Sequence, residues 1–213
     1  MSGAVVMGPR NVWIFGGAGT WHYDGKGWRS FRLPYTLNRA SAITGNDIWA
    51  VSATSGEPAL ARWHDRHWSS QRLPANILAH HVTLTDVTAT PAGDIWVVGG
   101  WFDSSEGHFV PVALEWASGR WQQVTIPGSI EPGRVIYDGL WMSYFKPQNT
   151  VTAMLHYTAG KWQTVRLPQV SGKQTLPIPL AQVPRSSTIF AAGGLWVLGG
   201  FPYSVGVILE YGQ

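Results

Sequence analysis

The segment Trp28-Arg-Ser-Phe-Arg-Leu-Pro34 recurs three more times along the chain, and this recurrence decides the fold. The other copies are Trp68-Ser-Ser-Gln-Arg-Leu-Pro74, Trp121-Gln-Gln-Val-Thr-Ile-Pro127 and Trp162-Gln-Thr-Val-Arg-Leu-Pro168. Five positions before each leading Trp stands another aromatic residue, which is Tyr23, Trp63, Trp116 or Tyr157. A short polar turn separates the two aromatics, so each copy predicts a β-hairpin.

A second signature precedes each hairpin and contains its own Trp. Its copies are Asn11-Val-Trp-Ile-Phe-Gly-Gly17, Asp47-Ile-Trp-Ala-Val-Ser52, Asp94-Ile-Trp-Val-Val-Gly-Gly100, Gly139-Leu-Trp-Met-Ser143 and Gly194-Leu-Trp-Val-Leu-Gly-Gly200. Short apolar runs of this kind are typical of strands buried on both faces. A further extended run and turn come before each of them, which completes a unit of four strands.

Four strands in about 45 residues is the size of a propeller blade. The sequence therefore predicts an all-β protein, a β-propeller of five blades of four antiparallel strands in one domain, with an incomplete last blade. The expected blades span roughly 1–34, 35–74, 75–127, 128–168 and 169–213. The last repeat has no Trp-led strand. We expect a three-stranded last blade, an edge strand supplied by a partner, or a larger propeller of which this chain is a part.

The repeated segments resemble a known family. Gly-Gly at the end of a strand, followed by Tyr or Trp and then Trp, resembles the kelch repeat. The pattern is more similar still to Trp-rich propellers of bacterial surface and secreted proteins. The resemblance implies domains that mostly bind partners and are enzymes only in some members. It implies no catalytic residues.

Composition and charge exclude several classes of protein. Charged residues make up 13% of the chain, and the net charge of +3 comes from scattered residues, so no basic patch for nucleic acid is expected. The absence of Cys excludes disulfides and thiolate metal sites. No apolar run reaches the length of a membrane helix, so no membrane insertion is expected. The start lacks a signal peptide, which leaves the compartment open between the cytoplasm and, for part of a longer exported chain, the cell surface. The oligomeric expectation is a monomer or part of a longer chain.

The variable loops lie on one rim of the predicted propeller. This rim carries the loops that follow the second strands and the links between blades, whereas the hairpin turns lie on the other rim and are short and repetitive. Binding residues of β-scaffolds concentrate in such variable loops. The candidate ligand-binding residues are Trp101, Phe102, Asp103, Glu106, His108, His80, His81, Tyr144, Lys146 and Tyr203.

Aromatic platforms beside polar groups suit sugar rings and peptide hot spots. We therefore expect a binding module for a carbohydrate or protein partner, with no cofactor and no metal. Asp103, Glu106 and His108 could gather around an ion only if their loop brings them together. Two alternatives stay open, which are a glycan-active hydrolase or lyase with carboxylates at the channel mouth, and a purely architectural domain of a larger surface protein. The repeated Trp residues are expected to pack between blades.

Overall fold

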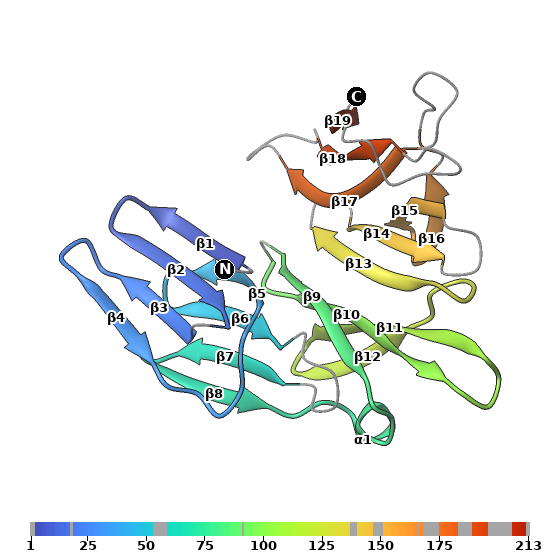
Figure 1. Ribbon diagram of the computed structural model, residues 1–213. Helices are drawn as coiled ribbons and strands as arrows, with labels where there is room; N and C mark the ends of the chain where they lie inside the picture. Colours follow the sequence, from blue (N-terminus) through green and yellow to red (C-terminus); the bar gives the residue numbers. More distant parts are fainter. Residues whose placement is uncertain are drawn as a thin grey trace. The chain divides into compact units, whose positions relative to one another are not determined.

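The computed structural model describes residues 3–17, 19–52, 59–90, 92–136, 140–146, 151–165, 167, 175–182, 189–195 and 206–211. For residues 145, 146, 151–153 and most of those beyond 174, the description covers the backbone only. The described residues form β-strands and one short helix (Figure 1). None of the helices in this part of the chain has the length and apolar character needed to cross a membrane.

Four sheets have four antiparallel strands each, in chain order, and each of them is a propeller blade. Blade 1 consists of β1 (Gly3–Gly8), β2 (Asn11–Gly16), β3 (Gly19–Tyr23) and β4 (Trp28–Phe31). Blade 2 consists of β5 (Arg39–Thr44), β6 (Asp47–Val51), β7 (Leu60–His64) and β8 (His67–Gln71). Blade 3 consists of β9 (Thr83–Ala89), β10 (Ile95–Asp103), β11 (His108–Ala117) and β12 (Arg120–Val124). Blade 4 consists of β13 (Glu131–Ile136), β14 (Trp141–Lys146), β15 (Val151–Thr158) and β16 (Lys161–Val165).

The remaining strands form a sheet of three. It consists of β17 (Thr175–Gln182), β18 (Ile189–Leu195) and β19 (Gly206–Tyr211). The structure therefore supports a propeller with four blades of four strands, and it does not support the expected count of five.

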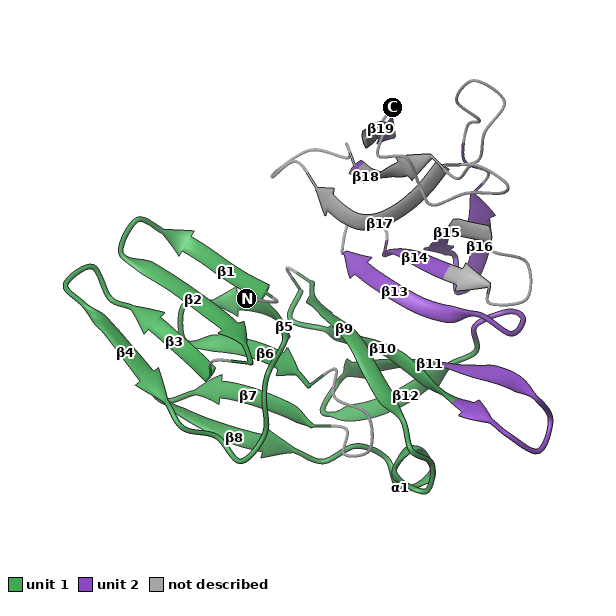
Figure 2. Ribbon diagram, viewed as in Figure 1, with its two compact units in different colours: residues 1–101, 112–125 green, residues 102–111, 126–213 purple. Residues whose placement is uncertain are grey.

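The chain divides into two compact units (Figure 2). Unit 1 comprises Met1–Trp101 and Val112–Thr125, and unit 2 comprises Phe102–Pro111 and Ile126–Gln213. In unit 1 the first strands β1, β5 and β9 pack in succession, as the innermost strands of neighbouring propeller blades do. In unit 2, β17 packs against β13.

The predicted hairpins between third and fourth strands are confirmed in blades 1 to 4. Each leading Trp lies opposite the aromatic five positions earlier, as in the pairs Trp63–Trp68 and Trp116–Trp121. In blade 2 the turn residues Asp65 and Arg66 both have positive φ, at 49° and 62°. Two successive positive φ values define the type I′ turn, whose twist matches that of the flanking strands.

The Gly-Gly doublet of blade 3 has a steric cause. The register of β9 and β10 shifts between Val98 and Gly99, which marks a β-bulge. A Cβ on Gly99 would run into the carbonyl oxygen of Thr83. Only glycine therefore lets the two strands approach this closely.

The second-strand Trp residues of blades 1 to 4 are buried, and those of blades 1 and 2 pack against the next blade. Trp13, Trp49, Trp96 and Trp141 are each at most 4% exposed. The Trp13 ring lies 4.8 Å from the Trp63 ring and 5.6 Å from the Trp68 ring, both of blade 2. In the same way, Trp49 of blade 2 lies 6.2 Å from Trp121 of blade 3. Packing between blades is thus confirmed for Trp13 and Trp49.

Packing between blades is not shown for two other repeated Trp residues, Trp28 and Trp196. Within unit 1, Trp28 is 50% exposed and tilts against Tyr23 of its own blade, so its packing between blades stays a prediction. Trp196 lies outside the described residues.

A polar pair accompanies each of the first two Trp residues. In blade 1, His22 stacks on Trp13 at 4.2 Å, and its Nε2 lies 2.9 Å from Asn11 Oδ1. In blade 2, Arg62 lies over the Trp49 ring and donates two hydrogen bonds of 2.8 and 2.7 Å to Asp47. The third-strand residue, His22 or Arg62, thus covers a face of the Trp ring in its own blade.

Blade 3 breaks this pattern because it has two acids at the equivalent positions. Burial raises the pKa of Glu115, and the negative charge of Asp94 adds to the rise. The ionised form of Glu115 is therefore disfavoured in the folded protein.

Replacing Trp49 by Ala should lower the free energy of unfolding by about 3–5 kcal/mol, because it empties a core between two blades. Trp28→Ala is the matched control on an exposed Trp and should cost about 1 kcal/mol or less. Denaturant titration of both variants measures the difference. Equal costs would contradict the packing role of the second-strand Trp.

Replacing Glu115 by Gln should stabilise the protein at neutral pH by about 0.5 kcal/mol, the scale of a partly exposed charge interaction. A raised folded-state pKa contributes stability that is fully present below the unfolded-state pKa of about 4.3 and is lost as the pH rises through the folded-state value. The gain should therefore disappear below about pH 4. Thermal midpoints across pH 3–8 measure it, with exposed Glu131→Gln as the control. A gain that does not depend on pH would contradict the electrostatic origin.

Candidate functional site

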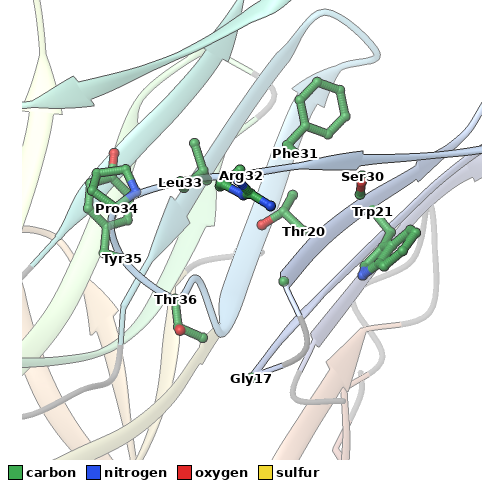
Figure 3. A pocket seen from close by; sticks show the side chains of 11 residues that line it. Gly17, Thr20, Trp21, Ser30, Phe31, Arg32, Leu33, Pro34, Tyr35 and Thr36 are labelled. Carbon is green, nitrogen blue, oxygen red and sulfur yellow. The ribbon is translucent and has the colours of Figure 1, made fainter.

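The variable rim of unit 1, hereafter the loop rim, carries a pocket on blade 1. Its walls come from the loop between β2 and β3, the adjoining ends of β3 and β4, and the link from residue 32 to residue 36 (Figure 3). The cavity has a volume of about 390 Å³. This size is near the lower end of small-molecule pockets, which span roughly 300–1,000 Å³.

Two features of the local sequence keep this pocket open. Gly17 and Gly19 place no side chain in the loop, and Gly19 has a φ of 112°, which other residues rarely adopt. The link follows β4 and contains Pro34. Its Tyr35 hydroxyl is hydrogen-bonded to Ser70 Oγ of blade 2 at 2.8 Å. The link is therefore held at both ends.

Thr20 supplies the most informative polar group of the pocket. Its side chain is 2% exposed, yet among the described residues its hydroxyl has no hydrogen-bond partner. The hydroxyl oxygen of Thr20 is not among the buried side-chain atoms that lack a partner, so it is accessible from the cavity. Figure 3 shows Thr20 directed into the same space as Arg32.

Arg32 gives the pocket its charge. Its side chain is exposed, and within the described part of the chain it forms no ion pair or hydrogen bond. No Asp or Glu is among the eleven described residues that line the cavity. The pocket is therefore cationic and carries several hydroxyls, those of Thr20, Ser30 and Thr36.

Trp21 forms the apolar wall. It lies opposite Ser30 across the β3–β4 pair and is 38% exposed. The corresponding third-strand residues of blades 2 and 3, two positions before the repeated aromatic, are Ala61 and Leu114, which are fully buried. Ala61 and Leu114 lie in the cores that blades 2 and 3 share with the preceding blade, whereas blade 1 is the first blade of unit 1.

The structure brings two of the predicted site residues together. His80, which follows the short helix α1 (Ala75–Leu78), stacks on Trp101 with ring centroids 4.1 Å apart and planes 6° apart. Trp101 also packs against the core between blades 2 and 3. His80 therefore covers a face of this ring, and the neighbouring His81 is exposed.

The predicted loop after Trp101 is a hairpin rather than an open loop. β10 continues to Asp103 and β11 begins at His108, so Phe102 lies in a strand and is 63% exposed. Asp103 Oδ1 accepts hydrogen bonds from the backbone N–H and the hydroxyl of Ser105, which hold the pKa of Asp103 below its usual value. A carboxylate bound in this way closes the turn.

Glu106 and His108 lie next to each other at this hairpin, with Glu106 Oε2 and His108 Nε2 3.4 Å apart. Within the described part of the chain, no three His, Asp or Glu residues are placed to share a metal ion.

The remaining predicted residues lie in unit 2. Tyr144 belongs to β14 and is 5% exposed, so it is not an exposed platform. Burial raises the pKa of Tyr144, and its side chain is hydrogen-bonded to Thr164. Lys146 is the last residue of β14, and its side chain is outside the description, as is the whole of Tyr203.

The sequence reasoning missed Thr20, Trp21 and Arg32. One signal was present for Trp21: of the 13 Trp residues, only Trp21 and Trp101 lie outside the repeated positions. Trp101 was among the predicted site residues, whereas Trp21 was not. Nothing in the sequence marks Arg32, because Arg72 and Arg166 occupy the same place in other repeats.

Comparison with known proteins bears on the fold. No protein-family model and no curated protein sequence matches the chain. Among solved structures, the extracellular domain of a putative hybrid two-component system from B. thetaiotaomicron is similar, with a TM-score of 0.62 and 12% identity over 99% of this chain. A protein of unknown function from Dyadobacter fermentans is similar with a TM-score of 0.56 and 11% identity over 89% of this chain.

This chain spans 27% of the length of the first structure and 66% of the second. At these identities the likeness shows the fold alone. The chain is similar to proteins with β-propeller architecture, and neither comparison supports the kelch-like, Trp-rich family specifically.

Proposed function

We propose that this propeller is a binding module that uses its loop rim to hold a carbohydrate. The observation that carries the proposal is the blade-1 pocket, whose lining includes both the partly exposed Trp21 and the hydroxyl of Thr20. Aromatic rings stack on the C–H faces of sugars, and hydroxyls pair with sugar hydroxyls. A pocket that combines both suits a saccharide better than an extended peptide.

The alternative of a glycan-active hydrolase or lyase is supported less well. Hydrolysis of a glycosidic bond needs, in most enzymes, two carboxyl groups flanking the bond. The described residues that line the blade-1 pocket include no Asp or Glu. The side chains of this pocket therefore support ligand binding better than hydrolysis.

Two finer assignments belong to this proposal. The first is the Trp-rich, kelch-like family, which the repeated segments favour. The second is an incomplete fifth blade formed by β17, β18 and β19, in which Tyr211 occupies the place of the repeated third-strand aromatic. The predicted residues of blade 3 would form a binding surface of their own, with exposed Phe102 as the residue available for stacking.

A glycan-array screen followed by calorimetry on the hits tests the site. Because Trp21→Ala removes the stacking surface, it should weaken binding at least 10-fold. This corresponds to a loss of about 1.4 kcal/mol of binding free energy. Phe102→Ala, the matched loss of an exposed aromatic, should leave the affinity of the pocket unchanged.

Thermal unfolding serves as the control for Trp21→Ala, whose midpoint should stay within about 2 °C of the wild type, less than the shift expected of 1 kcal/mol in a domain of this size. Loss of binding in Phe102→Ala alone would move the site to blade 3. A folded protein that binds no glycan would overturn the carbohydrate proposal.

A further inference from the structure

We infer that the blade-1 pocket takes an acidic saccharide, with the carboxylate of a uronic acid residue placed at Arg32. The inference rests on the proposed function and names its ligand class. Its basis is the combination of one cation, several hydroxyls and one aromatic wall in a single cavity of about 390 Å³.

The charge of the lining selects for an anion. Arg32 contributes a guanidinium, and no carboxylate lies among the described lining residues to neutralise it. By contrast, Arg62 on blade 2 is fully engaged with Asp47. A guanidinium offers two parallel N–H donors that match a carboxylate, and such charge-assisted pairs are stronger than neutral hydrogen bonds.

The hydroxyls identify the anion as part of a polyhydroxylated molecule. The hydroxyl of Thr20 lines the cavity and forms no side-chain hydrogen bond among the described residues. Ser30 and Thr36 line the same cavity and form no hydrogen bond through their side chains within the described residues. A ligand with hydroxyls next to its carboxylate satisfies these groups together, which a simple inorganic anion does not.

Trp21 adds the requirement for a flat apolar face. An indole ring beside a cation and hydroxyls fits a pyranose ring that carries its carboxylate at the edge and its C–H groups on one face. A uronic acid residue has all three features.

The test uses disaccharides of galacturonate, glucuronate and mannuronate, each compared with its methyl ester, which keeps the ring and removes the charge. Calorimetry on the whole chain should show at least one free acid bound 10-fold or more tightly than its ester. Raising the salt concentration should weaken binding of the acid and not of the ester, because screening acts on the charge.

Arg32→Gln should bring the affinity for the acid down to that for the ester. Arg72→Gln is the matched control, because Arg72 is exposed and occupies the same position in the next repeat. It should leave both affinities unchanged.

Equal affinity for acids and esters, or equal effects of the two Arg substitutions, would overturn the acidic ligand. If esters then still bind and Trp21→Ala abolishes that binding, the proposed carbohydrate function stands without this inference. If no acid or ester binds the folded protein, the acidic-ligand inference fails, and the array screen then decides the proposed function independently. A fall in the thermal midpoint of Trp21→Ala as large as that of Trp49→Ala would assign Trp21 to packing and overturn the pocket as a stacking site.

Discussion

The edge-to-face and tilted packing of the second-strand Trp of one blade against the third- and fourth-strand aromatics of the next is the interaction on which the rest of the structure depends. Trp13 with Trp63 and Trp68, and Trp49 with Trp116 and Trp121, fill the wedges between twisted sheets. Each of these four-stranded sheets has large apolar side chains on the face that meets the next blade, and exposing that face to water would cost free energy. Burying these rings between neighbouring blades gives each sheet its partner.

This arrangement leaves the loop rim free to vary. The Trp residues and type I′ turns fix the sheets and the turn rim. The link after β4 contributes Leu33, Tyr35 and Leu37 to the core that contains Trp13. The pocket is lined on one side by Gly17 and Gly19 of the variable loop after β2 and on the other by Arg32 and Thr36. The variable loop is the part of this lining that differs between repeats.

Much of the fold could be predicted because its determinants are local. The spacing of Tyr23 and Trp28 defines a hairpin within six residues of chain, and its register follows. The pairing of Arg62 with Asp47 was not predicted, because cross-strand neighbours depend on register and side-chain direction. The site was harder still. Whether Tyr144 is exposed depends on where β14 ends, and the unpartnered hydroxyl of Thr20 depends on what surrounds it in space.

The most direct test of the central claim is a double-mutant cycle between Trp13 and Trp63, using Leu at each position to keep the sites apolar. Denaturant titration of the wild type, both single variants and the double variant gives the coupling free energy between the two blades. The packing described above predicts a coupling of about 0.5–1.5 kcal/mol, the value of an edge-to-face aromatic pair. Additivity within about 0.3 kcal/mol would mean that the two rings are energetically independent, and it would contradict the claim that this stack holds the blades together.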